Sequence, residues 1–241
     1  MKVVHLVSGG LRLDADIFYP SNMRAGKKYP AILFVHGWTS SRDRSYQYAE
    51  SLALLGYVCM VFDMRGHGTS EGDRLELSSK DFLDDVFVAY DYLANLPEVD
   101  PENISANGSS FGGFLVALLA SKRKLKSLVL RAPADYPDEE FSTPKKLRNW
   151  ENIVEWRGKE KNVDETSALQ SLSSFSGRVL FIESENDERI PRQTILNFAN
   201  ALPNQSQVSY VVMEGAPHSI KEGPFRDQVG HILIDWFKNK I

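Results

Sequence analysis

One stretch of the sequence places a serine where it could act as a nucleophile. Residues 104–113 read ISANGSSFGG and are followed by the apolar run FLVALLA. A strand, then G-x-S-x-G, then a helix is the context of the sharp turn that holds a nucleophilic serine above a sheet. The positions two before and two after that serine favour glycine because a β-carbon is poorly tolerated there. Gly108 and Gly112 occupy them around Ser110. We therefore predict that Ser110, and not the adjacent Ser109, is the nucleophile.

A serine hydroxyl is a poor nucleophile until a histidine takes its proton, and that histidine needs an acid to fix its tautomer. In sites of this type the chain order is Ser, then Asp or Glu, then His. Only His218 and His231 follow Ser110. His218 comes directly after the predicted strand VSYVVM and its loop, whereas His231 lies inside an amphipathic helical pattern. We predict that His218 is the base and that His231 is structural.

The acid is expected in the loop after the predicted strand RVLFI. Residues 185–191 read ENDERIP, which places Asp187 just before the turn into the next helix. Asp187 is the predicted acid, and Asp135, which follows the predicted strand SLVL, is the competing candidate. The remaining carboxylates of the loop are predicted to be solvated: Glu183, Glu185 and Glu188.

An oxyanion site should complete the chemistry, because the tetrahedral intermediate of acyl transfer needs oriented donors for its negative oxygen. One donor is predicted to be the backbone N–H of Phe111, directly after the nucleophile. The other is expected in the loop His36-Gly37-Trp38-Thr39, which follows the run AILFV. Gly37 would let the backbone approach the substrate, and the Trp38 N–H is the candidate donor. The Trp38 indole would also line the acyl pocket.

Alternating strands and helices must position these residues. The opening stretches Lys2–Val7 and Leu11–Tyr19 meet at two glycines and predict an antiparallel hairpin. Short, wholly apolar runs predict strands buried on both faces of a parallel sheet: Ala31–Val35, Tyr57–Phe62, Ile104–Ala106, Ser127–Leu130, Val179–Ile182 and Val208–Met213. Helical periods lie between them: Tyr46–Leu55, Phe82–Leu96, Phe114–Ala120, Gln193–Leu202 and Phe225–Lys238. This alternation predicts an α/β fold with a mostly parallel central sheet, helices on both faces and the hairpin at one edge.

Residues 134–176 break the alternation, since they contain prolines, many charges and no buried strand. The segment is too long for a plain connection, so we expect a short inserted lid in a single domain over residues 1–241. A poorly ordered surface excursion is the alternative, but Trp150 and Trp156 need something to pack on. These two tryptophans, together with Trp38 and Asp135, are the predicted substrate contacts.

Composition excludes several other classes of protein. The 241 residues carry a net charge of −4 without a basic cluster, which argues against nucleic-acid binding. Cys59 is the single cysteine, so an internal disulfide and a thiolate zinc cluster are excluded. No apolar stretch approaches a membrane span, and residues 1–10 do not read as a signal peptide. We expect a cytoplasmic protein with no metal or other cofactor and no membrane partner. Its oligomeric state is left open, with a homodimer as one arrangement.

The motifs resemble those of the α/β-hydrolase superfamily, in the group of serine esterases that includes feruloyl and cinnamoyl esterases and serine-aminopeptidase-like hydrolases. The matching strings are VHGWTSS, FDMRGHGTSEG, NGSSFGG, ENDERIP and GAPHS. The resemblance implies the α/β-hydrolase fold and an acyl-enzyme mechanism. It also implies that the D-x-R-G-x-G-x-S motif, residues 63–70, is scaffolding, with Arg65 tying loops together and His67 in a structural role.

The expected activity is hydrolysis of small-molecule carboxylic esters with small to medium acyl or aryl groups. A thioesterase, a peptidase or amidase, and an acyltransferase use the same triad, so the motifs do not separate them. A non-catalytic ligand-binding protein on this scaffold is the alternative from another class, and it usually lacks one of the parts. Acidic residues in 183–188 and 135–140 predict an acidic pocket mouth that disfavours strongly anionic substrates.

Overall fold

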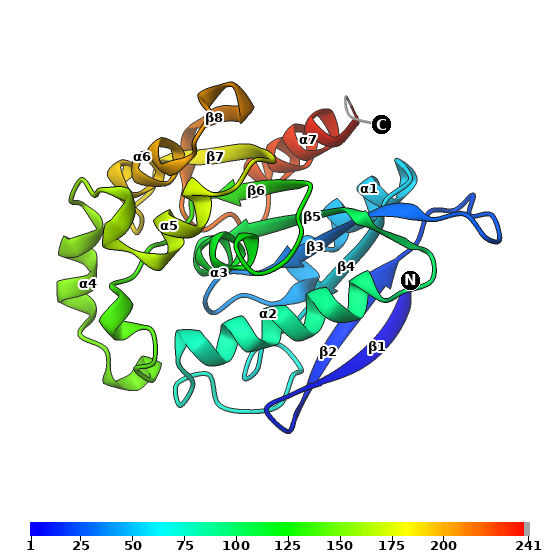
Figure 1. Cartoon of the computed structure of the whole chain (residues 1–241), viewed down its shortest axis with the longest axis horizontal. Coiled ribbons are helices and arrows are strands. Elements are labelled where there is room, and N and C mark those ends of the chain that lie inside the picture. The colour runs from blue at the N-terminus through cyan, green and yellow to red at the C-terminus, as the bar shows by residue number, and fades with distance from the viewer. Residues whose placement is uncertain (239–241) are drawn as a thin grey trace.

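A central sheet of eight strands runs through the computed structural model, which describes residues 1–238 (Figure 1). The strand order is β1-β2-β4-β3-β5-β6-β7-β8. The strands are β1 (Lys2–Ser8), β2 (Leu11–Phe18), β3 (Tyr29–Val35), β4 (Val58–Phe62), β5 (Val99–Ser109), β6 (Ser127–Arg131), β7 (Arg178–Asn186) and β8 (Val208–Pro217). The pairs β1–β2 and β2–β4 are antiparallel and the others are parallel. The predicted α/β class, with its N-terminal hairpin at one edge, is confirmed.

Helices cover both faces of the sheet, and each face has its own apolar core. The helices are α1 (Tyr46–Leu54), α2 (Ser79–Ala94), α3 (Phe111–Ala120), α4 (Trp150–Arg157), α5 (Ser167–Ser173), α6 (Arg192–Ala201) and α7 (Pro224–Lys238). On one face α1 packs against α7. On the other face α2, α3, α5 and α6 follow one another (Figure 1). Burial on both sides explains why β3, β4, β6 and β7 read as continuous apolar runs. The prediction that Val208–Met213 is buried on both faces is wrong, because β8 is an edge strand and is partly exposed.

Two helices begin three residues earlier than the hydrophobic pattern predicts. Helix α2 begins at Ser79, three residues before the predicted Phe82, because Ser78 and Asp81 form a capping box. The Ser78 N–H donates to Asp81 Oδ2 at 2.9 Å. Helix α3 begins at Phe111, directly after Ser110, and this start defines the turn on which the site depends.

The predicted lid, residues 134–176, folds as short helical turns and two helices. The 3₁₀ turns are η2 (Asp138–Glu140), η3 (Lys145–Leu147) and η4 (Val163–Glu165). Helix α5 packs on α3 and buries Ala168 and Leu169 completely, so it belongs to the core of the sheet-covering layer. Helix α4 lies at the periphery, on the side away from the N-terminal hairpin (Figure 1). The last three positions of the predicted 1–241 domain lie outside the described residues.

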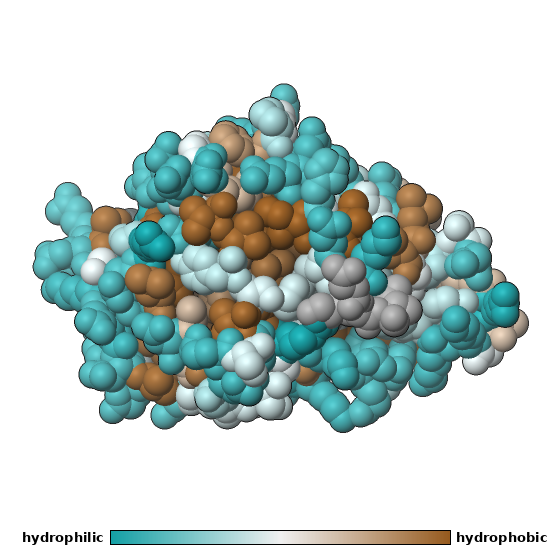
Figure 2. Space-filling view, turned by 90° about the horizontal axis from the view of Figure 1, so that it is seen from above, coloured by the Kyte–Doolittle hydropathy of each residue, from teal (hydrophilic) through white to brown (hydrophobic). Residues whose placement is uncertain are grey.

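None of the helices in residues 1–238 has the length and apolar character that a bilayer crossing requires. The face on which β8 and α7 lie carries a band of apolar side chains bordered by hydrophilic ones (Figure 2). Val212 of the edge strand β8 is 38% exposed. The apolar surface on this face is therefore interrupted by charged and polar groups, as on ordinary protein surfaces.

Candidate active site

Ser110 occupies the sharp turn between β5 and α3 with φ 52° and ψ −115°, a backbone conformation that non-glycine residues rarely adopt. Flanking backbone segments approach so closely that only glycine fits beside the turn. A β-carbon on Gly108 would lie 2.4 Å from the Gly112 carbonyl oxygen, and one on Gly112 would lie 2.1 Å from the Val35 carbonyl oxygen. The steric argument made from the G-x-S-x-G pattern therefore has a direct counterpart in the fold.

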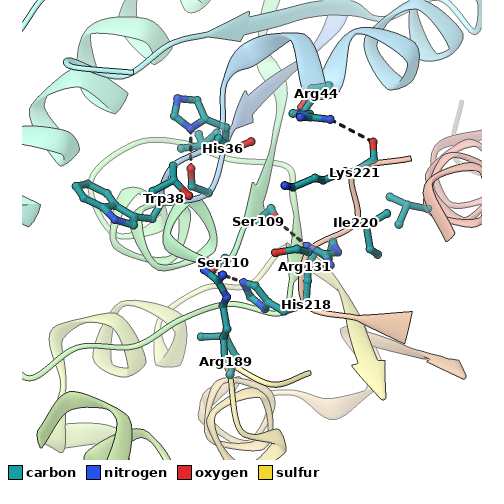
Figure 3. Close-up of a pocket in the computed structure, with 18 of the residues that line it drawn as sticks. His36, Trp38, Arg44, Ser109, Ser110, Arg131, Arg189, His218, Ile220 and Lys221 are labelled. Carbon is teal, nitrogen blue, oxygen red and sulfur yellow. Dashed lines mark hydrogen bonds between the residues drawn. The ribbon is translucent and has the colours of Figure 1, made fainter. Parts of the chain in front are cut away.

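Ser110, Asp187 and His218 are each the first residue after a strand of the sheet, namely β5, β7 and β8. Parallel strands bring their carboxyl ends to one edge, so the three side chains meet there. His218 Nε2 lies 3.0 Å from Ser110 Oγ (Figure 3), and His218 Nδ1 lies 2.7 Å from Asp187 Oδ2. With Nδ1–H donating to the carboxylate, Nε2 accepts the serine hydroxyl, which is the arrangement of a nucleophile, base and acid.

Asp187 is held as a carboxylate by several donors. Its Oδ1 accepts the N–H groups of Arg189 at 2.9 Å and Ile190 at 2.7 Å. Burial alone would raise the pKa of Asp187, but the hydrogen bonds from His218 and from these two amides outweigh it and hold the pKa below its usual value. The group is consequently anionic at neutral pH, as the stabilisation of an imidazolium requires.

Two further side chains hold the backbone of His218. The His218 N–H donates to Glu188 Oε2 at 3.0 Å, so Glu188 is engaged and is not the freely solvated carboxylate that the sequence predicts. Arg131, at the end of β6, donates to the His218 carbonyl oxygen and, at 3.0 Å, to Ser109 Oγ. Sequence reasoning did not single out Arg131, because its partners come from two distant segments. Both residues fix the position of the imidazole through the main chain.

The loop after β3 lies directly against Ser110. A β-carbon on Gly37 would lie 3.2 Å from the Ser109 carbonyl oxygen and 3.4 Å from Ser110 Cβ. Within residues 1–238, neither the Phe111 N–H nor the Trp38 N–H has a hydrogen-bond acceptor. Two amides without acceptors, one on each segment beside the serine, are the kind of donors that an oxyanion needs.

The Trp38 indole rests on a cluster of rings beneath this loop. It makes edge-to-face contacts with His67 at 5.1 Å, Phe82 at 5.7 Å and Phe111 at 5.9 Å between ring centroids. Such contacts fix the plane of an aromatic side chain beyond what its burial contributes. Trp38 is therefore rigidly placed, with part of its ring lining the cavity described below.

Two buried histidines support the same loop in their neutral form. His36 donates from Nδ1 to the Gly37 carbonyl oxygen at 2.9 Å, and its Nε2 accepts the Met64 N–H at 3.1 Å. Burial lowers the pKa of His36 to about 4 and that of His67 to about 3. No cluster of three or more His, Cys, Asp or Glu side chains that could hold a metal ion occurs among residues 1–238.

The D-x-R-G-x-G-x-S segment makes the kind of contacts expected of scaffolding. Arg65 donates from Nε to Asp85 Oδ1 at 2.6 Å and from its N–H to Asp85 Oδ2 at 2.9 Å, which ties the segment to α2. Asp63 accepts the N–H groups of Arg42 at 2.7 Å and Thr69 at 3.1 Å. These bonds join two loops behind the site without contacting Ser110.

Lys145, from the 3₁₀ turn η3, is a residue near the site that sequence reasoning missed. The side chain is 1% exposed, and its Nζ lies 3.8 Å from the ring centroid of Phe111, 4.6 Å from Tyr136 and 5.2 Å from Trp38. Its hydrogen bond goes to Ser79 Oγ at 3.3 Å. Burial lowers the pKa of Lys145. A lysine in a charged stretch gives no sequence signal for this environment, which tertiary packing of the inserted segment creates.

A cavity of about 620 Å³ adjoins Ser110 and His218. Of the predicted substrate contacts, Trp38 and Trp150 line it. Trp156 and Asp135 are not among the lining residues. Trp156 contacts Lys161 instead, whose Nζ lies 3.9 Å from the centroid of the Trp156 ring.

Asp135 is buried beside the inserted segment and has no hydrogen bond to His218 among the described residues. Its Oδ1 accepts the Tyr136 N–H at 2.9 Å, and Thr166 Oγ1 donates to Oδ2 at 3.3 Å. Burial raises the pKa of Asp135 to about 7. The geometry therefore favours Asp187 over this competing acid. His231 lies within α7, outside the lining of the cavity.

The predicted acidic mouth is wrong. Of the two acidic stretches, only Glu188 lines the cavity, whereas Glu183 is buried and accepts the Tyr210 hydroxyl, and Asp138 accepts the Ser167 N–H at the start of α5. The charged groups that line the cavity are otherwise cationic: Arg157 and, labelled in Figure 3, Arg44, Arg131, Arg189 and Lys221. The spacing of residues along a loop does not determine where their side chains point. For this reason the cavity lining is mainly cationic where the sequence predicts an acidic one.

Comparison with known proteins identifies a family and several relatives. The sequence profile of the prolyl oligopeptidase family matches residues 43–241. The chain is 32% identical over 133 residues to the quorum-quenching protein AidA of Acinetobacter baumannii, covering 54% of this chain and 43% of AidA. It is 28% identical over 207 residues to a probable dipeptidyl-peptidase 5 of Aspergillus terreus, covering 79% of this chain and 28% of that protein. The chain thus spans less than half the length of these two curated relatives.

One solved structure has a similar fold over nearly the whole length of this chain. Est1E of Butyrivibrio proteoclasticus, solved with ferulic acid bound, superposes with a TM-score of 0.76 at 19% identity and covers 98% of both chains. At this identity the likeness concerns the fold, and it places the eight-stranded sheet among the α/β-hydrolases.

Proposed function

The chain belongs to the prolyl oligopeptidase family of α/β-hydrolase serine hydrolases, and from this premise we propose that it hydrolyses carboxylic esters with small to medium acyl or aryl groups. The observation that carries the proposal is the chain of hydrogen bonds, 3.0 and 2.7 Å long, that joins Ser110 to His218 and His218 to Asp187. In this proposal Ser110 is the nucleophile, His218 the general base and acid, and Asp187 the group that orients the imidazole.

Acylation follows from that arrangement. The Ser110 hydroxyl gives its proton to His218 Nε2 while Oγ forms a bond to the ester carbonyl carbon. The carbonyl π electrons move to the oxygen, which the N–H groups of Phe111 and Trp38 receive. When the tetrahedral intermediate collapses, the bond to the alkoxy or aryloxy group breaks, and that group takes the proton from His218. The product of this half-reaction is an acyl-Ser110 ester and a free alcohol or phenol.

Deacylation uses the same groups with water in place of serine. His218 takes a proton from a water molecule, whose oxygen adds to the acyl carbon. The bond to Ser110 Oγ then breaks, Oγ regains the proton from His218, and a carboxylic acid leaves. No step requires a group that this chain does not supply, apart from water.

An ester substrate is favoured over a peptide with a free amino terminus by the charges at the cavity. A carboxylate in the pocket gives the strongest recognition of an ammonium group, because it pairs with the charge. Glu188 is the one carboxylate among the described residues that line the cavity, and it already accepts the His218 N–H. A peptidase or amidase with a blocked or neutral substrate is the second candidate, which the similarity to dipeptidyl-peptidase 5 supports. Thioesters suit the same triad.

We further propose a single catalytic domain in which the inserted segment, residues 134–176, supplies a short lid. Trp150 of this segment and Trp38 of the loop after β3 would form two walls of the acyl pocket. The aromatic surface of both side chains suits an apolar acyl or aryl group.

Covalent labelling combined with ester hydrolysis tests the proposal. Ser110→Ala should abolish hydrolysis of p-nitrophenyl acetate and labelling by a fluorophosphonate probe, whereas Ser109→Ala should still be labelled. Labelling that persists in Ser110→Ala would assign the nucleophile elsewhere. A rate comparison across acetyl, butyryl, octanoyl and aryl esters, one thioester and one aminoacyl amide then ranks the substrate classes. An amide turned over faster than every ester would favour the second candidate.

A further inference from the structure

The cavity beside Ser110 is positively charged, although the whole chain carries a net charge of −4. Five cationic side chains line it against one carboxylate, Glu188. Only Arg189 among those cations has a carboxylate within salt-bridge distance in the described part of the chain, and that partner is Glu188 at 3.6 Å. Cations that face a cavity without carboxylate partners are available to an anionic ligand.

Three of the cations have partners inside the protein that limit what they can bind. Arg131 donates to the His218 carbonyl oxygen and to two hydroxyl groups, so its role is to hold the base. Arg157 donates from Nε to the Asp135 carbonyl oxygen at 2.9 Å and lies over the Tyr136 ring at 4.4 Å. Arg189 is paired with Glu188.

Arg44 and Lys221 have fewer hydrogen-bond and ion-pair partners inside the protein. Arg44 Nη1 donates to the Lys221 carbonyl oxygen at 3.3 Å, which places the two residues together. The Lys221 ammonium has no hydrogen bond or ion pair to another residue in 1–238. Figure 3 shows both side chains on the side of the cavity away from Trp38, with the Lys221 side chain directed inward. We call Arg44 and Lys221 the cationic wall.

The position of the cationic wall relative to His218 indicates which part of a substrate it would meet. His218 protonates the leaving group in the proposed mechanism, so the leaving group lies on the His218 side of Ser110. Lys221 is three residues beyond His218 in the same loop. Apolar side chains also line this cavity: Tyr48, Ile220 and Leu233. An alcohol or phenol with an apolar body and an anionic end matches this lining.

Resting on the proposed esterase function, we propose that the preferred substrate is an ester whose alcohol or phenol part carries a carboxylate, which Arg44 and Lys221 bind. The carboxylate does not take part in bond breaking. It orients the leaving oxygen toward His218 and increases capture of the substrate. The aromatic side, with Trp38 and Trp150, is left for an uncharged acyl group.

A pair of nearly isosteric acetate esters tests the proposal. The anionic member is 4-acetoxybenzoate and the neutral member is 4-acetoxybenzamide, and the readout is the ratio of their kcat/KM values. Comparing this ratio between enzymes cancels the intrinsic difference in reactivity of the two esters. We expect the Arg44→Gln, Lys221→Gln double variant to lower the ratio roughly tenfold, the effect of two partly exposed charge contacts. In the wild type the ratio should also fall as salt rises to about 0.5 M, because salt screens such contacts.

The matched control is Lys122→Gln, which removes an exposed cation away from the cavity and should leave the ratio unchanged. An unchanged ratio in the double variant would overturn the inference. The inference would also be overturned if the double variant lowered kcat/KM only for p-nitrophenyl hemiglutarate relative to p-nitrophenyl butyrate. That result would place the bound anion on the acyl side of the substrate. A wild-type protein that hydrolyses none of these esters and resists fluorophosphonate labelling would overturn the proposed function itself. Labelling with an unchanged ratio overturns only the substrate preference.

Discussion

Gly112→Ala is the most direct perturbation of the turn that presents Ser110. The added β-carbon would lie 2.1 Å from the Val35 carbonyl oxygen and 2.6 Å from that of His36. Real β-carbons essentially never come within 3.0 Å of such atoms, so the gap must widen by about 0.9 Å. Both obstructing atoms belong to the backbone, and no flexible side chain can move aside to relieve the clash.

The displacement falls on the segment that leads into the oxyanion loop. Moving the start of α3 away from the end of β3 separates Phe111 from Trp38, whose amides receive the same oxygen in the proposed mechanism. A misplacement of about 1 Å near reacting groups can cost roughly a hundredfold in rate, so we expect kcat for p-nitrophenyl acetate to fall by about that factor. Overpacking at a close-packed position should also lower the free energy of unfolding by about 3 kcal/mol.

Gly230→Ala is the matched control, since it makes the same substitution within α7. There the added β-carbon would meet the Tyr48 ring at 3.6 Å, an ordinary contact. We expect this variant to be more stable than the wild type by about 0.5–1 kcal/mol, because alanine loses less backbone entropy in a helix. Urea unfolding and initial rates, measured for both variants, provide the comparison. A Gly112→Ala protein with wild-type stability and kcat would refute the steric argument.

Three other substitutions test the electrostatics. Asp187→Asn should lower kcat roughly a thousandfold or more while Asp135→Asn leaves it close to the wild-type value, and initial rates showing the reverse would make Asp135 the acid. Burial raises the pKa of Asp135 from 3.8 to about 7, so its stabilising contribution is complete below pH 4 and is lost by pH 7. The wild type should therefore lose more stability than Asp135→Asn over this window in urea unfolding, and equal slopes would contradict the shift. Because burial lowers the pKa of Lys145, the free energy of unfolding falls as pH falls below 10.5. Lys145→Met should therefore raise the urea midpoint by more at pH 8 than at pH 10.5. A rise in the midpoint that does not depend on pH would disprove a lowered pKa.

Local sequence patterns were sufficient for the strands and for the turn at Ser110. Strands β3, β4, β6 and β7 are buried on both faces, so their apolar runs are short and continuous and their ends are marked by polar residues. Glycine is required at positions 108 and 112 because of contacts within one turn and with its immediate neighbours. The spacing of glycines in the sequence is therefore enough to predict the turn. The start of α2 was missed because the cap at Ser78 depends on hydrogen bonds and not on apolar periodicity.

Residues whose environment comes from distant segments were beyond such reasoning. Arg131 meets His218 across 87 positions of sequence, and Lys145 enters a cluster of rings contributed by other elements. The predicted acidic mouth failed for the same reason. Glu183 sits in an acidic stretch but turns toward Tyr210 and Arg192, away from the cavity. Composition of a loop reports how many charges it has, whereas packing decides where they point.

Ser110, Asp187 and His218 each follow a strand directly. This feature separates the geometry of proton transfer from the range of substrates, two properties that are often inherited together. Neighbouring strands lie about 4.8 Å apart, so their register and spacing set the distances between the three reacting groups. Many of the residues that line the cavity come instead from the inserted segment and from loops such as the one that carries Lys221. Those segments can lengthen, shorten or change charge without altering the strand ends. Substrate range in descendants of this chain can accordingly diverge while the proton-transfer geometry is retained, and a library for altered selectivity should be confined to the loops.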